Sequence, residues 1–203
     1  MPGTTGDIPS GVHDFAQLAE AYCRLIDERA QYSGDQLLSR VHGLLPRLYA
    51  AALALPAFGY EAPDDEWEDE DEDEEGDEKD EPYDIEVALA EGQEDRVPHE
   101  QSREVFRSLG SMISELDSYA EVFDPYGDPQ EELVTGCLSD DLTDIYGEIA
   151  DGLAKWRRGE HENAAHEWRM SFIIHWGEHL TGALRAIHAL AADGKLTFPA
   201  GTP

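Results

Sequence analysis

The chain has 203 residues, of which 46 are acidic and 14 basic, and its formal charge at pH 7 is −32. Apolar residues make up 40% of it, enough to bury a core, which excludes a wholly disordered chain. Because nucleic acids and anionic membranes are bound through clustered Lys and Arg, this charge excludes direct binding to either. The length suits one domain.

Cysteine content and hydropathy bear on the compartment. The two cysteines, Cys23 and Cys137, are too few for a disulfide framework, and both lie in apolar helical patterns. The N-terminal residues lack a basic stretch followed by an apolar one, and the longest apolar stretch, residues 48–58, is interrupted by Pro56. It is also too short to span a bilayer. We therefore expect a cytoplasmic protein with no membrane segment.

The first part of the chain predicts two helices. Apolar residues recur every three or four positions over about 12–32 and again over 34–56, which places them on one helical face. A flexible N-terminus, residues 1–11, precedes the first helix, and Ser33 can cap the second. Because proline removes a backbone donor and clashes with the preceding turn, Pro46 predicts a kink near 43–45 or two short helices.

An acidic segment follows. Residues 61–82 hold 16 of the 46 acidic side chains and a single base, Lys79, for a local charge of −15. Like charges at this density repel, and almost nothing apolar is available to bury. The segment is predicted to be a disordered insertion loop, followed by a short helix over 83–92.

The second half predicts three further helices, or four if the middle one is interrupted. Helical spacing resumes at residue 99 and continues to 123, where Asp-Pro stops it. The run DPQE at 128–131 is a helix start signal, with a break at Gly136 and a cap at Ser139 as the alternative start. This helix is expected to close at about residue 158, and a last one to span 160–193, before a flexible C-terminus, 194–203.

These patterns together predict the fold class. No alternating strand pattern of useful length and no hairpin signal is present. The chain is therefore expected to be all-α, a single-domain antiparallel bundle of about five helices over 12–193, with the acidic loop 61–82 inserted in it.

The C-terminal half resembles a known family. The segments LSDDLTDIYGEIADGL, FIIHWGEH and ALRAIH, between residues 138 and 188, are similar to the bacterial family called domain of unknown function 5063. The likeness extends more weakly to FAQLAEAYCRLID and LLPRLYAAALALP in the first two helices. The resemblance implies a compact helical domain and brings no activity with it.

One candidate site is an acidic helical stripe. The segment DDLTD at 140–144 matches a pattern with which some helical enzymes hold magnesium and a diphosphate. At helical spacing Asp141, Asp144 and Glu148 lie on one stripe, so their carboxylates can approach one cation. The same stripe is also typical of the solvated face of an acidic protein, and this alternative stays open.

The second candidate is a histidine pair. His175 and His179 are four residues apart, so one helix can present both imidazoles to one transition metal. A carboxylate from Asp141, Asp144 or Glu148 on a neighbouring helix would complete a set of two histidines and one carboxylate. The alternative is a pair of histidines beside the core that only form hydrogen bonds.

Two functions follow from these features. The first is a non-catalytic interaction or regulatory module whose acidic surface engages a basic protein partner. The second is a divalent-metal-dependent hydrolase or metal-binding protein that uses His175, His179, Asp141, Asp144 and Glu148. Convergence of the two candidate groups in one concave pocket would favour the second.

Overall fold

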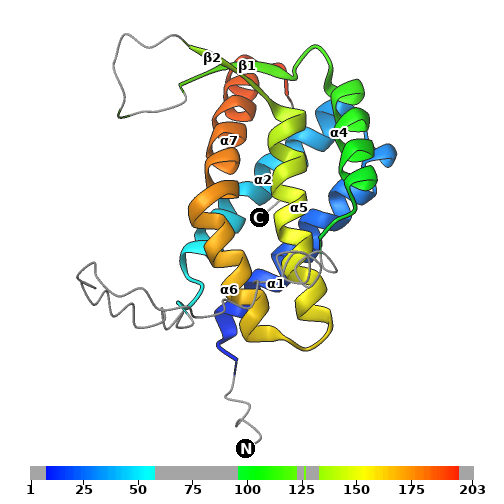
Figure 1. The fold of residues 1–203 in the computed structure, drawn as a ribbon. Coiled ribbons are helices and arrows are strands. Elements are labelled where there is room, and N and C mark those ends of the chain that lie inside the picture. Colours follow the sequence, from blue (N-terminus) through cyan, green and yellow to red (C-terminus); the bar gives the residue numbers. More distant parts are fainter. Residues whose placement is uncertain (1–7, 58–95, 123–125, 127–132, 197–203) are drawn as a thin grey trace, which may run out of the picture.

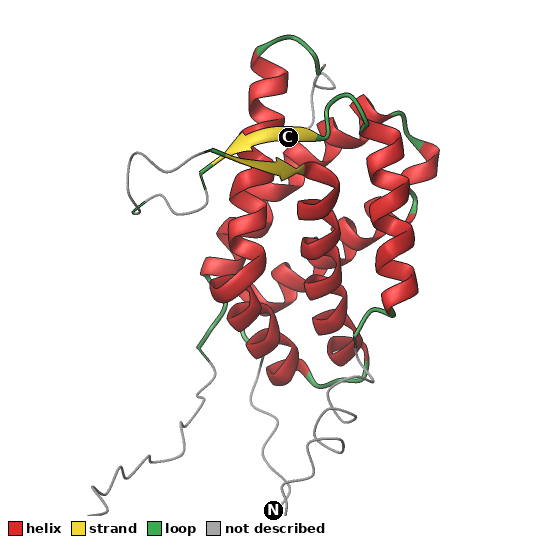
Figure 2. Ribbon diagram, turned by 45° about the horizontal axis from the view of Figure 1, so that its top comes forward, coloured by secondary structure: helices red, strands yellow, loops and turns green. Residues whose placement is uncertain are grey.

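The computed structural model describes residues 8–57, 96–122, 126 and 133–196, and this part of the chain is a helical bundle with one small hairpin (Figures 1 and 2). The helices are α1 (Ser10–Asp27), α2 (Gly34–Leu53), α4 (His99–Ile113), α5 (Leu138–Arg157), α6 (His161–Ser171) and α7 (Gly177–Ala192). A π-helical segment, Phe172–Trp176, joins α6 to α7, and a 3₁₀ turn, Arg29–Gln31, follows α1. The predicted all-α fold class is confirmed. None of the described helices is long and apolar enough to cross a membrane.

Several predicted segments fall outside the described residues. They are the acidic loop 61–82, the short helix 83–92 and most of both predicted flexible ends. Within the predicted N-terminal tail, Ser10 and Gly11 already belong to α1. The first helix ends at Asp27 instead of residue 32, because the chain tightens there into the 3₁₀ turn.

Helix α5 lies at the centre of the bundle and packs against α1, α4, α6 and α7 (Figure 1). Its apolar face is fully buried. Two tyrosines also form hydrogen bonds between α5 and α1. Tyr22 Oη donates to the Leu142 carbonyl at 2.9 Å, and Tyr146 Oη donates to Asp27 Oδ1 at 2.8 Å. Contacts on so many sides make α5 a rigid support for the side chains it carries.

Trp168 fixes α6 against α5. Its ring is fully buried, and its Nε1–H donates to the Ile149 carbonyl at 3.0 Å. Gly152 makes this approach possible, because a Cβ at that position would overlap the Trp168 indole. The rod formed by α6, the π-helical segment and α7 is thereby held along α5.

Helix α2 is continuous through Pro46, so of the two alternatives predicted there, a kink or two short helices, the second is wrong. Leu45 and Leu48, on both sides of the proline, are fully buried, and their burial offsets the lost hydrogen bond. The predicted cap is present: Ser33 Oγ accepts from the Gln36 amide, and the Gln36 side chain accepts from the Ser33 amide.

The β-hairpin bears on two predicted helix limits. The helix expected over 99–123 ends at Ile113, and β1 (Ser118–Glu121) follows it. The start signal at 128–131 lies outside the described residues, and α5 begins at Leu138, close to the alternative start predicted after Gly136. It follows β2 (Val134–Cys137), which pairs antiparallel with β1. Asp117 accepts hydrogen bonds from the Ser139 amide (2.7 Å) and hydroxyl (2.9 Å). The start of α5 is therefore capped by a distant residue, which a local pattern cannot reveal.

The predicted last helix, 160–193, contains the π-helical segment. Trp176 is fully buried there, and its Nε1–H lies 3.1 Å from Ser171 Oγ. Gly177 is required at its end, because a Cβ would overlap the Phe172 carbonyl. Such π turns occur often at functional sites, and this one carries His175.

Candidate metal centre

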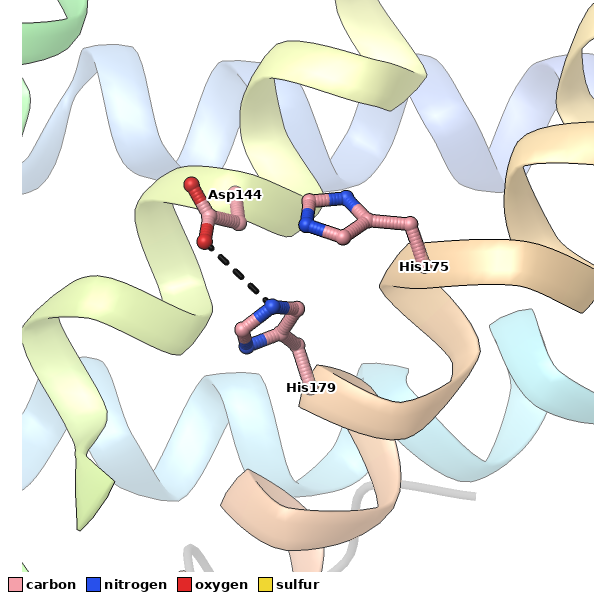
Figure 3. A group of neighbouring side chains, drawn as sticks. All are labelled: Asp144, His175 and His179. Carbon is pink, nitrogen blue, oxygen red and sulfur yellow. Dashed lines mark ion pairs between the residues drawn. The ribbon is translucent and has the colours of Figure 1, made fainter. Parts of the chain in front are cut away.

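Three side chains from α5, the π-helical segment and α7 turn towards one another: Asp144, His175 and His179 (Figure 3). One potential ligand atom from each lies within 4.8 Å of the others. His179 Nε2 is 3.4 Å from Asp144 Oδ2, and the two imidazole centroids are 4.8 Å apart. No other group of three or more His, Cys, Asp or Glu converges in this way in the described part of the chain. The set offers two imidazoles and one carboxylate.

The other two predicted ligands lie behind the histidines. Asp141 Oδ1 is 2.9 Å from His179 Nδ1, and Glu148 Oε1 is 3.1 Å from His175 Nδ1. A carboxylate can only accept a hydrogen bond, which Nδ1–H must donate, so both contacts favour the tautomer in which Nε2 keeps its lone pair. Metal-binding histidines are commonly oriented by carboxylates in this manner. Asp141 and Glu148 therefore orient the imidazoles, while Asp144 faces them.

Tyr119 of the hairpin extends this arrangement. Asp141 is 4% exposed, and its Oδ2 accepts a hydrogen bond from Tyr119 Oη at 2.8 Å. The same hydroxyl lies 3.2 Å from Glu121 Oε2, but it has one proton, and the shorter contact is to Asp141. Gly182 of α7 leaves space for the Tyr119 hydroxyl, since a Cβ there would come within 2.6 Å of Tyr119 Oη. Tyr119 could not be predicted as part of the site, because no local sequence pattern indicates the hairpin that carries it.

The carboxylates also set the charge of the site. The hydrogen bond to Asp141 raises the pKa of His179, burial opposes this, and nearby Asp144 adds to it. Burial raises the pKa of Asp144, against the lowering effect of His179. Since a metal binds neutral imidazole and ionised carboxylate, protons compete with a metal for these groups.

A cavity of about 250 Å³ adjoins two of the three residues, Asp144 and His175. Asp144 and His175 form part of its wall, and α5 continues the wall through Glu148 and Asp151. The rest of the wall comes from Ser102 of α4, from Arg96 and Val97 just before that helix, and from Glu167 of α6. A small molecule in the cavity would therefore lie against two of the three converging side chains.

The half-buried carboxylate of Asp151 is expected to make the free energy of unfolding depend on pH. Burial raises its pKa to about 6, although its carboxylate accepts the Val97 amide at 2.7 Å. Because this pKa is above the unfolded value, the folded state holds the proton more tightly. The contribution of protonated Asp151 to the stability of the folded state is complete below about pH 4 and is lost as the pH rises through about 6.

The variant Asp151→Asn retains an acceptor for Val97 and cannot titrate. Its free energy of unfolding, minus that of the wild type, is expected to increase between pH 4.5 and pH 7 in urea denaturation. Asp193→Asn, at an exposed position after α7, is the control and should show no such trend. A difference for Asp151→Asn that does not change with pH would contradict the burial of an ionisable carboxylate here.

Comparison with known proteins places the chain in a family. The family model described as "Domain of unknown function (DUF5063)" matches residues 7–91 and 81–193. The crystal structure of protein BF1032 from Bacteroides fragilis is similar, with a TM-score of 0.59 and 22% identity, over 95% of this chain and 96% of that one. At that identity the likeness concerns the fold alone. No curated protein gives a significant match. The chain belongs to the DUF5063 family.

Proposed function

We propose that the protein binds one divalent transition-metal ion through Asp144, His175 and His179. The observation that carries the proposal is the pair of carboxylates on the histidine Nδ1 atoms, at 2.9 Å and 3.1 Å, which leaves both Nε2 atoms for the metal. Imidazole ligands favour Zn²⁺, Mn²⁺, Fe²⁺, Co²⁺ or Ni²⁺ over Mg²⁺ and Ca²⁺, which take oxygen ligands.

A simple ion pair accounts for the geometry less well. His179 between Asp141 and Asp144 could be an imidazolium held by two carboxylates. That role does not explain His175, whose ring lies 4.8 Å from that of His179 and is oriented by its own carboxylate. Two protonated imidazoles at this distance repel each other, whereas one divalent ion satisfies both rings and Asp144 together.

Three protein ligands also leave coordination positions open, as catalytic metal sites do and closed structural sites do not. A metal ion held by Asp144, His175 and His179 would supply the activation of water that hydrolysis needs near neutral pH. We propose hydrolysis as the reaction class that this centre supports. The adjoining cavity supplies the space for a substrate beside Asp144 and His175.

Metal titration tests the proposal. Protein stripped with EDTA is expected to bind one equivalent of Zn²⁺, Mn²⁺ or Co²⁺ per chain, and its thermal midpoint should rise. Binding to the folded state alone adds about 2.7 kcal/mol of stability at a free metal concentration one hundred times the dissociation constant. No bound ion and no change in midpoint with any of these metals would overturn the proposal.

The hairpin provides a milder variant. Tyr119→Phe removes the donor to Asp141 Oδ2 and leaves the ring in place, so His179 should be less firmly oriented. We expect the metal dissociation constant to rise about tenfold, the lower end of the range for residues that orient ligands. Tyr32→Phe, where the ring lies under Arg40, is the matched control and should bind metal as the wild type does. Equal affinities for all three proteins would show that the hairpin does not support the site.

The net charge of −32 supports a second proposal, that the acidic surface engages a basic protein partner. Such binding weakens as salt screens the charges. Affinity purification at low salt is expected to recover a specific partner that is lost at about 0.5 M salt. Recovery of abundant basic proteins only would contradict a specific partner.

A further inference from the structure

The cavity beside the candidate metal centre is large enough for an organic ligand. An engineered cavity of about 150 Å³ in another protein holds benzene, and this cavity measures about 250 Å³. Its wall follows α5 from Asp144 to Asp151, seven residues apart. At 1.5 Å per residue these positions are separated by about 10 Å. The space is therefore suited to an elongated molecule with one end at the metal ligands and the other near Asp151.

The far end of the cavity carries the carboxylate of Asp151, and the only cation lining the cavity, Arg96, lowers its pKa without forming an ion pair with it in the described residues. Glu148 contacts His175, and Glu167 pairs with Lys155 Nζ at 2.8 Å. Asp151 accepts one backbone hydrogen bond, from Val97, and forms no ion pair in the described residues. Burial, then the nearby charges of Glu148 and Glu167, raise its pKa to about 6, so near neutral pH it is mostly ionised at a cost. A cation bound there would remove that cost.

The end of the cavity at Asp144 and His175 suits a different ligand group, one that can coordinate a metal ion. An ion held by Asp144 and His175 would present its open positions to the cavity, because both residues line it. Divalent ions accept carboxylate or carbonyl oxygen as exogenous ligands. Arg96 also lines the cavity and is the arginine that could bind an anion at the far end instead.

We propose that the cavity binds a small molecule with a metal-coordinating carboxylate or carbonyl oxygen at one end and a primary ammonium group at the other, with the ammonium held by Asp151. This assignment rests on the proposed metal site, since the near end of the ligand coordinates that ion. It names ω-amino carboxylates and their amides as the ligand class.

Isothermal titration of the metal-loaded, full-length chain tests the assignment with three probes. They are 6-aminohexanoate, hexanoate, which lacks the ammonium, and adipate, which has a second carboxylate in its place. We expect 6-aminohexanoate to bind about tenfold more tightly than hexanoate, which is about 1.4 kcal/mol. Asp151→Asn should reduce this ratio to near one and retain one metal per chain, whereas Asp193→Asn should leave the ratio unchanged.

The outcomes separate this inference from the metal proposal. A chain that binds metal but shows equal or undetectable affinity for 6-aminohexanoate and hexanoate would overturn the ligand class and leave the metal site intact. Tighter binding of adipate would also overturn it, in favour of an anion at Arg96. Failure to bind any metal, measured first, would overturn the proposed function and this inference with it.

Discussion

Replacing His175 and His179 together by glutamine is expected to abolish metal binding and the rise in thermal midpoint that accompanies it. Two of three proposed ligands are lost, and the remaining Asp144 carboxylate alone holds a divalent ion too weakly to survive at micromolar concentration. Glutamine retains polar atoms near Asp141 and Glu148, so neither carboxylate is left in an apolar surrounding. Metal content after gel filtration and thermal denaturation with and without Zn²⁺ are the measurements.

The chain offers a matched control for that double variant. His13 and His161 flank Trp156 and have ring centroids 6.2 Å apart, as a second histidine pair away from Asp144. His13→Gln/His161→Gln should bind metal with unchanged stoichiometry. If the His175/His179 variant still binds one equivalent of metal, or if the control loses it, Asp144, His175 and His179 are not the ligands.

Replacing Trp168 by alanine is expected to lower the free energy of unfolding by about 3–5 kcal/mol, the usual range for a large buried aromatic. The ring is fully buried against Gly152 and Phe15, and the substitution removes the donor to the Ile149 carbonyl. Because Trp168 holds α6 along α5, the distance between the histidines and Asp144 depends on it. Urea denaturation measures the loss.

Met170→Ala on the same helix is the control for Trp168→Ala. Its side chain is 42% exposed, so the change in stability should stay within about 0.5 kcal/mol. A loss below about 1 kcal/mol for Trp168→Ala would mean that α6 is not fixed to α5 by this residue. The metal centre would then need another explanation for its rigidity.

Helical periodicity was sufficient to predict the bundle, because the stripes it identified are those that pack on the core. It failed at the described residues 114–122 and 133–137. Leu116 and Ala120 continue the helical spacing of α4, but the backbone at Ala120 is paired with Thr135 in the hairpin. Strands of four residues have too few alternating positions to be recognised, and their hydrogen bonds link residues that local patterns do not connect.

The candidate site could be predicted only as a set of residues. The spacing of His175 and His179 and the stripe Asp141, Asp144, Glu148 identified the five side chains. Which of them face one another depends on how α7 is rotated against α5, and that rotation is set by tertiary packing at Trp168 and Gly152. The separation into facing and orienting carboxylates was therefore beyond sequence analysis.

The most direct test of the metal proposal is an anomalous difference map from crystals of the protein grown with Zn²⁺ or Mn²⁺. One peak per chain is expected between α5 and α7, with Asp144 oxygen, His175 Nε2 and His179 Nε2 each about 2.0–2.2 Å from it. Asp141 and Glu148 should remain on the Nδ1 atoms. No peak at this position, with His179 Nε2 still paired to Asp144, would contradict the proposal that these residues form a metal site.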